Sequence, residues 1–249
     1  MEKLHTYLSL CTEVYDLSKP EPPKDAYSFY REYAKQVEGL ILEPMCGTGR
    51  FLLPLVEEGF DVHCYDASDN MLQALYNKAS IKKLKPTVWK GFIESLATKQ
   101  LYKLIFIPSG SFCLITDLST IKSTLRKFFD HLEKGGVLLF EVETSHSLPP
   151  LGIWRGSKWD RSHNKKIILS QFAVLDSDIC TSIGRYDLID NHQVIQTEIE
   201  EYKIKLYEED ELKSLLNQAG FSDVRAIKAF NRNALPEVND ESIVYQCIK

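Results

Sequence analysis

The segment Ile41-Leu42-Glu43-Pro44-Met45-Cys46-Gly47-Thr48-Gly49-Arg50 passes from an apolar run to a carboxylate and then to two glycines. The apolar residues that lead into it, from Gly39 to Leu42, are typical of a buried strand. Glu43 stands at the expected carboxyl end of that strand, and the glycines allow the chain to turn sharply and to approach a ligand closely. The run from Arg50 to Glu58 predicts a helix, whose first N–H groups lack partners within the helix and can hold an anion. We therefore expect a strand-turn-helix unit with a ligand at the turn.

Two familiar nucleotide-binding loops are disfavoured by the residues that follow the glycines. A phosphate-binding loop needs Lys followed by Ser or Thr, and this pair is absent after Gly49. A dinucleotide fingerprint that begins at Gly47 needs a third glycine where Leu52 stands. A nicotinamide-dependent oxidoreductase is therefore a weakened alternative.

A second acidic residue follows the next predicted strand, Phe60 to Tyr65. Asp66 comes 19 positions after Gly47 (66 − 47), about the spacing at which α/β nucleotide folds place the acid that binds a ribose. A carboxylate there can accept hydrogen bonds from both ribose hydroxyls. Asp66 could also simply begin a turn in which Ser68 caps a helix over residues 69–79, and the two roles are compatible.

With the acid at 43 and the glycines at 47 and 49, the segment resembles the first motif of the class I S-adenosylmethionine-dependent methyltransferases, (Glu/Asp)-x-Gly-x-Gly-x-Gly. Met45 stands where the first glycine is common. The resemblance spans most of residues 39–249 and is weakest over 150–205. It implies a Rossmann-like α/β fold, with a seven-stranded, mostly parallel sheet, helices on both faces and an antiparallel insertion after the fifth strand. It also implies an enzyme whose cofactor is S-adenosylmethionine.

The resemblance assigns parts of the cofactor to individual residues. Glu43 would face the ammonium, the N–H groups of residues 47–50 the carboxylate, and Asp66 the ribose. The family usually has an Asp for the adenine amino group where this sequence has Phe92, so that contact stays open, with Glu94 as a substitute. The predicted cofactor-binding residues are Tyr15, Tyr30, Glu43, Met45, Cys46, Gly47, Thr48, Gly49, Asp66, Ala67, Met71, Phe92, Ile93, Pro108 and Ser109.

The first 38 residues are rich in tyrosine, and Pro20-Glu21-Pro22-Pro23 predicts a break between two helices. Residues 1–38 could pack against the sheet edge. They could also form a lid, in which Tyr15 and Tyr30 cover the cofactor and an aromatic face attracts the sulfonium by about 0.5 to 2 kcal/mol.

Periodicity and turn residues organise the rest of the chain. A core over residues 39–149 is expected to contain strands at 86–90, 101–107 and 137–142, with a helix over 117–132. Its C-terminal part, residues 206–249, is expected to add a helix at 208–219 and strands at 221–227 and 242–248. Between these parts, residues 150–205 contain three strand-like runs, 165–175, 179–189 and 193–207, which predict an antiparallel meander. We expect this insertion to be a substrate cap, and the alternatives are a dimerisation sheet, which would make a homodimer, or a cover for a sheet edge.

A general base is needed only if the methyl acceptor must lose a proton. The candidates are Glu143, His146 and Tyr15, with His163 as a weaker one. Nucleobase amino methyltransferases typically carry (Asp/Asn)-Pro-Pro-(Tyr/Phe), which residues 107–110 lack. Methylation of a base amino group is therefore disfavoured.

Composition sets limits on partners and location. The net charge of -5 and the pI near 5.7 give no sign of a basic surface, so nucleic acid is not an expected partner. The six cysteines include no C-x-x-C pair and the six histidines have no ligand spacing, which predicts free thiols and no metal site. No apolar run approaches a membrane span and no signal core begins the chain, so we expect a cytoplasmic protein with no membrane partner.

The sequence therefore predicts methyl transfer from S-adenosylmethionine to an O, N or C centre of a small molecule. One alternative is a protein or nucleic-acid methyltransferase. Another is a non-catalytic sensor or scaffold that binds the same cofactor, which a closed cap without a cavity beside the methyl group would favour.

Overall fold

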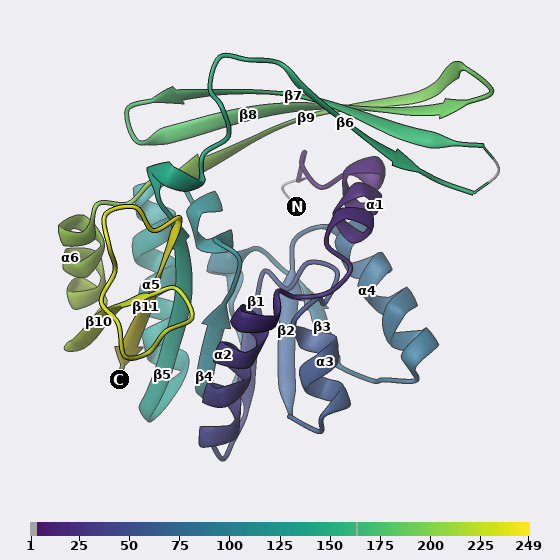
Figure 1. Ribbon diagram of the computed structural model, residues 1–249. Coiled ribbons are helices and arrows are strands. Elements are labelled where there is room, and N and C mark those ends of the chain that lie inside the picture. The colour runs from purple at the N-terminus through teal and green to yellow at the C-terminus, as the bar shows by residue number, and fades with distance from the viewer. Residues whose placement is uncertain (1–3, 163) are drawn as a thin grey trace.

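The computed structural model describes residues 4–162 and 164–249, so His163 lies outside the described residues. Seven strands form one sheet in the order β10-β11-β5-β4-β1-β2-β3 (Figure 1). β11 runs antiparallel to both of its neighbours, and the other strand pairs are parallel. This confirms the predicted fold class. The strands are β1 (Ile41–Pro44), β2 (Val62–Asp66), β3 (Thr87–Lys90), β4 (Tyr102–Ile107), β5 (Leu132–Glu143), β10 (Asp223–Lys228) and β11 (Ser242–Ile248).

Helices cover both faces of this sheet because strand side chains alternate between two apolar cores. In β4, Ile105 packs in the core under α5 and α6, while Leu104 and Phe106 pack under α2, α3 and α4. The result is a three-layer α/β/α arrangement. The helices are α2 (Lys24–Gln36), α3 (Leu52–Glu57), α4 (Asp69–Lys82), α5 (Leu118–His131) and α6 (Glu209–Ala219).

Side chains at the helix ends explain why the helices begin and end where they do. The Ser68 hydroxyl accepts a hydrogen bond from the N–H of Met71 at 3.2 Å, which confirms the predicted cap of α4. Asp117 caps α5 through the N–H of Thr120 at 2.8 Å. Strand β5 begins at Leu132, earlier than predicted, since Leu132 already pairs with Tyr102 of β4.

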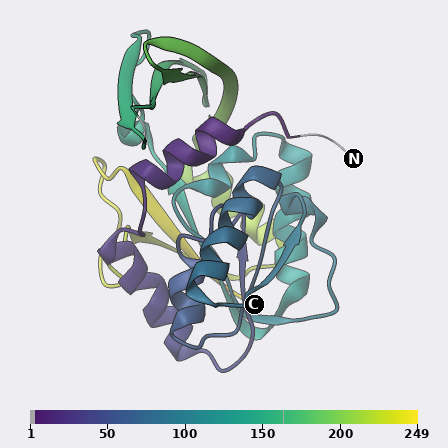
Figure 2. The ribbon, with the colours of Figure 1, turned by 90° about the vertical axis from the view of Figure 1, so that its right-hand side faces the viewer.

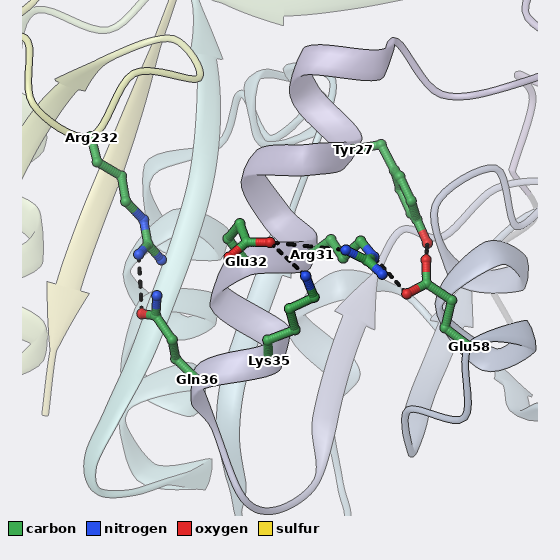
Figure 3. Close-up of polar contacts among 7 residues, drawn as sticks. All are labelled: Tyr27, Arg31, Glu32, Lys35, Gln36, Glu58 and Arg232. Atoms are coloured by element: carbon green, nitrogen blue, oxygen red, sulfur yellow. Dashed lines mark hydrogen bonds and ion pairs between the residues drawn. The ribbon is translucent and has the colours of Figure 1, made fainter.

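Polar contacts fasten the outer face of α2 at both ends (Figure 3). The hydroxyl of Tyr27 and the guanidinium of Arg31 both donate to Glu58, just beyond α3. At the other end, Arg232 of the loop before β11 donates to Gln36 at 3.0 Å. α2 is thus tied to elements on both sides and lies on a face of the sheet.

A second sheet is inserted between β5 and α6, above the carboxyl edge of the main sheet (Figure 1). It is antiparallel in the order β6-β7-β8-β9 and has four strands, where the sequence predicted three. The extra strand, β6, contains Gly156 and is short, and its register is set by pairing with β7, for example Arg155 opposite Gln171. The strands are β6 (Arg155–Asp160), β7 (Lys166–Asp176), β8 (Ile179–Asp190) and β9 (Gln193–Lys205).

Helix α1 (Ser9–Ser18) lies directly under the second sheet (Figure 2), and the Pro-rich break before α2 confirms the two predicted N-terminal helices. Leu10 and Val14 pack against apolar residues on the inner face of the second sheet. On its other side, Asp16 accepts hydrogen bonds from the Thr48 hydroxyl (2.6 Å) and the Lys78 ammonium (2.8 Å). α1 therefore fills the space between the two sheets.

Within the described ranges, no helix has the length and apolarity needed to cross a membrane.

Candidate functional site

The turn after β1 has the backbone that its glycines permit. Gly47 and Gly49 have φ values of 54° and 79°, and Met45 has a φ of 57°. An L residue in this left-handed region is strained by about 1 to 2 kcal/mol. Met45 thus adopts the backbone that a glycine would adopt easily, and its side chain lines a cavity above the turn.

Asp66 lies at the carboxyl end of β2, beside this turn. Its two carboxylate oxygens accept hydrogen bonds from the N–H groups of Gly47 and Ser68, both at 2.8 Å. Burial raises the pKa of Asp66, and these two hydrogen bonds partly oppose the rise. Each oxygen keeps further lone pairs, so the carboxylate can also accept from a diol.

A first cavity of about 550 Å³ opens above the carboxyl ends of β1, β2 and the turn after β3. It brings together most of the residues predicted to hold the ribose and adenine. The apolar side chains lie across the cavity from its acidic residue. The apolar wall therefore suits a flat ring, and the acidic wall suits a hydroxylated sugar. The predicted residues that line it are Tyr15, Met45, Gly47, Asp66, Ala67, Met71, Phe92 and Ile93, together with Glu94.

Glu43 and Arg50 place a carboxyl group and a guanidinium in the layer that supports this cavity. Glu43 is 2% exposed, and its Oε2 has no hydrogen-bond partner among the described residues. Burial raises the pKa of Glu43 well above its usual value, although the charge of Arg50 lowers it in part. Arg50 donates to the Ser109 hydroxyl at 2.6 Å, while its buried Nε has no partner in the described part of the chain. An unpaired acceptor and an unpaired donor fit the ammonium and carboxylate of an amino-acid group.

A second cavity of about 590 Å³ lies between α1, the end of β5 and the inner face of the second sheet. Alternate residues of β6 and β9 point into it, as the two-residue period of strands requires. Its wall is polar and aromatic, including Trp159, Gln171 and Tyr186. The two cavities adjoin, since they share the residues Thr6, Tyr7, Tyr15, Ser111, Leu114 and Tyr202.

Glu143 is a carboxylate of this second cavity, at the end of β5. Its carboxylate accepts a hydrogen bond from the Ser147 hydroxyl at 3.3 Å. Burial raises the pKa of Glu143, with Ser147 and the charge of Lys19 opposing the rise. A Cβ at Gly110 would lie 2.6 Å from the Glu143 Cγ, so only glycine leaves room for this side chain.

Two carboxylates of β9 hold the start of α1 over the site. Glu200 accepts from the N–H groups of Tyr7 and Leu8, and Glu198 accepts from the N–H of Leu10 at 2.7 Å. The first N–H groups of a helix have no partner within the helix, and these side chains supply one from another element. The second sheet therefore holds Tyr7, which lines both cavities, in position.

Several predicted residues are not brought to the cavities. Tyr30 is fully buried on the apolar face of α2, where its ring lies 5.4 Å from that of Phe106, so it does not cover the site. His146 is exposed, because the chain turns outward at the 3-10 turn η3 (Ser145–Ser147) after β5 ends at Glu143. Glu43, Cys46, Thr48, Gly49 and Pro108 lie in the supporting layer and line neither cavity, while Ser109 lines the second.

Tyr15 lines both cavities, as a predicted site residue should. Its ring already lies 5.4 Å from the Lys19 ammonium and 5.4 Å from the Arg50 guanidinium. These two cations lessen the attraction that the ring could offer a sulfonium.

Other cavity residues were missed in the sequence, chiefly Tyr7, Lys19, Arg155 and Tyr202. The alternation of side chains along β6 and β9 is a signal for Arg155 and Tyr202, but a strand has two faces and the sequence does not tell which is inner. In the described part of the chain, the cysteines are free thiols and no cluster of three or more His, Cys, Asp or Glu could hold a metal.

Comparison with known proteins agrees with this geometry. Residues 41–136 match a family described as a methyltransferase domain. A provisionally named methyltransferase of Geobacillus sp. (strain WCH70) is 24% identical over 245 residues, which cover 91% of this chain and 93% of that protein.

Two solved structures share the fold over nearly the whole chain. One is an S-adenosylmethionine-dependent methyltransferase from Clostridium acetobutylicum ATCC 824, with a TM-score of 0.79, 21% identity and coverage of 95% of this chain and 96% of that one. The other is the sugar N-methyltransferase KedS8 from Streptoalloteichus sp. ATCC 53650, with a TM-score of 0.79, 15% identity and coverage of 100% and 96%. At these identities the structural likeness establishes the fold. The chain therefore has the fold of S-adenosylmethionine-dependent methyltransferases, and its residues 41–136 match the methyltransferase domain family.

Proposed function

We propose that this enzyme methylates a small polar molecule bound in the second cavity, at an oxygen or nitrogen atom beside Glu143. The observation that carries the proposal is the pair of adjoining cavities. The first has a carboxylate at Asp66 and an apolar slot at Phe92 and Ile93, while the second is polar and contains Glu143. The wall they share is where a methyl group would pass from one to the other.

The residues of the first cavity fit S-adenosylmethionine. Asp66 would accept from the ribose hydroxyls, and Phe92 and Ile93 would pack against adenine. Glu43 and Arg50 do not line this cavity, but their unpaired Oε2 and Nε atoms lie in the layer that supports it and would meet the ammonium and the carboxylate of the methionine part. When bound, the cofactor supplies a methyl group already activated by its positively charged sulfur.

Glu143 would orient the acceptor and take its proton. A carboxylate whose pKa is raised is a better base near neutral pH than an ordinary surface glutamate. Holding the acceptor in line with the methyl group can itself contribute several kcal/mol of the barrier. A proton on the attacking atom is characteristic of oxygen and nitrogen acceptors, so Glu143 favours these over carbon.

We further propose that residues 150–205 act as a cap and residues 1–38 as a lid. The second sheet roofs the second cavity, and α1 closes its side. Enclosure excludes water and strengthens the electrostatic interactions inside. The cover that the second sheet forms also favours a small acceptor over a protein or a nucleic acid. The likeness in fold to a sugar N-methyltransferase favours it as well.

The sensor alternative is less well supported. It was favoured by a closed cap with no cavity beside the methyl group, and the second cavity provides that space.

Isothermal titration with S-adenosylmethionine, S-adenosylhomocysteine and NAD in parallel tests the cofactor assignment. We expect both sulfur compounds to bind and NAD not to bind. A screen of small amines and alcohols with methyl-labelled cofactor then tests the acceptor. Failure of both sulfur compounds to bind would refute the proposal.

A further inference from the structure

Arg155 is an unpaired cation in the wall of the second cavity. It begins β6, and it shares the inner face of that strand with Ser157 and Trp159, which also line the cavity. Across the strand pair it stands opposite Gln171, a further polar lining residue. The pairing of β6 with β7 therefore places several polar side chains of the second sheet around the Arg155 guanidinium.

One nitrogen of the Arg155 guanidinium lacks the partner that a buried donor requires. Its Nε is buried and makes no hydrogen bond to any described residue, and no carboxylate of the described chain lies within ion-pair distance of it. Two other arginines of this insertion differ: Arg161 pairs with Glu13, and Arg185 pairs with Asp187 at 2.9 Å. Buried donors are nearly always satisfied, so a ligand is the natural source of the missing acceptor.

The charges of the cavity favour an anionic ligand at this position. The lining cations are Lys19 and Arg155, and the lining carboxylates are Glu143 and Glu200. Both oxygens of Glu200 already accept from backbone N–H groups of Tyr7 and Leu8. Glu200 is thus occupied by the segment before α1, and no ion pair joins Arg155 to a carboxylate among the described residues.

We infer that the methyl acceptor carries an anionic group, a carboxylate or a phosphate, and that Arg155 binds it. The planar fork of a guanidinium matches two oxygens of either group with two parallel hydrogen bonds. Ser157 and Gln171 offer further polar contacts beside it. The anionic end of the acceptor would lie against β6 of the second sheet. Its reactive atom would lie toward Glu143 and the residues shared with the first cavity. This inference rests on the proposed function, because it assumes that the second cavity holds the acceptor.

The test titrates two probes, inorganic phosphate and malonate, into the full-length protein saturated with S-adenosylhomocysteine. Arg155→Met removes the proposed anchor. Lys158→Met is the matched control, since it removes one positive charge from the outer face of the same strand, where Lys158 pairs with Asp160 at 3.0 Å. We expect the wild type to bind at least one probe, Arg155→Met to bind it roughly tenfold more weakly or worse, and Lys158→Met to bind it like the wild type.

The outcomes separate this inference from the proposed function. Binding of phosphate alone or malonate alone, lost in Arg155→Met, supports the inference and assigns the class of anion. No saturable binding of either probe to the wild type, or equal binding by wild type and Arg155→Met, overturns it. Binding of S-adenosylhomocysteine is measured on each sample first. Its retention in Arg155→Met shows a folded cofactor site, whereas its absence from the wild type would refute the proposed function itself.

Discussion

The carboxylate of Glu200 accepts a hydrogen bond from the backbone N–H of Tyr7 at 2.8 Å, across 193 residues of sequence. The same carboxylate accepts from the N–H of Leu8 at 2.7 Å. Tyr7 lines both cavities, and Glu200 lines the second. One side chain of the inserted sheet thus positions a residue that lines both cavities.

Glu200→Gln should loosen the segment before α1. The amide would turn an NH₂ group toward one of two backbone donors, and losing a hydrogen bond to a charged group costs about 1.5 to 3 kcal/mol. Hydrogen–deuterium exchange should therefore be faster at the N–H groups of Tyr7 and Leu8. Asp176→Asn, an exposed carboxylate of the same sheet, is the control and should leave this exchange unchanged. Equal protection in all three proteins would mean that Glu200 does not hold the segment.

Asp66→Ala should weaken S-adenosylmethionine binding by about 1.5 to 3 kcal/mol, the range for hydrogen bonds to a charged group. Isothermal titration measures this change. Asp69→Ala, which removes a largely exposed carboxylate at the start of α4, should bind the cofactor normally. Unchanged affinity in a folded Asp66→Ala protein would remove Asp66 from the site.

Glu43→Gln should change the pH dependence of stability. Burial raises the pKa of Glu43 in the folded chain, so the folded state holds a proton that the unfolded state releases above its pKa of about 4.3. The contribution of Glu43 to stability should be fully present below that pH and should be lost as the pH rises through the folded pKa. Glutamine does not ionise, so the variant should lose this decline.

Urea unfolding without cofactor, from about pH 4 to about pH 8, measures the difference. Similar free energies of unfolding for the two proteins at low pH, with the variant more stable at high pH, are expected. Parallel curves over the whole range would contradict the buried, ionisable Glu43. Above the folded pKa of Glu43, cofactor affinity should fall in the variant, because a neutral amide attracts an ammonium less than a carboxylate does.

Glu143→Gln should lower kcat with the identified acceptor by roughly 10² to 10⁴, the usual contribution of a general base, and leave cofactor affinity unchanged. Wild-type activity should rise with pH through the raised pKa of Glu143, since the base must be deprotonated, and the variant should lack this rise. His146→Ala should retain kcat because its side chain is exposed and outside the cavities. A large effect of His146→Ala with a small one of Glu143→Gln would reverse the assignment.

The core of the fold was predictable because its signals are local. The apolar run before Glu43, the glycines at 47 and 49 and the periodic helix ending near Leu132 each specify an element over a few residues. Parallel strands also end at one edge of a sheet, so the acid at the end of β2 could be expected to lie near the turn after β1. Asp66 and Gly47 do meet there, at 2.8 Å.

The second cavity depended on contacts that no local pattern encodes. Whether Arg155 or Lys158 faces inward is set by the register between β6 and β7, and a shift of one residue would exchange them. Glu143 and His146 are three residues apart, yet only the first lines a cavity, because the strand ends and the chain turns outward between them. Glu200 meets Tyr7 only because the inserted sheet folds back over α1. The sequence thus predicted the turn after β1 and the position of Asp66, because these groups follow consecutive strands, whereas only the packing of distant segments determined the second cavity.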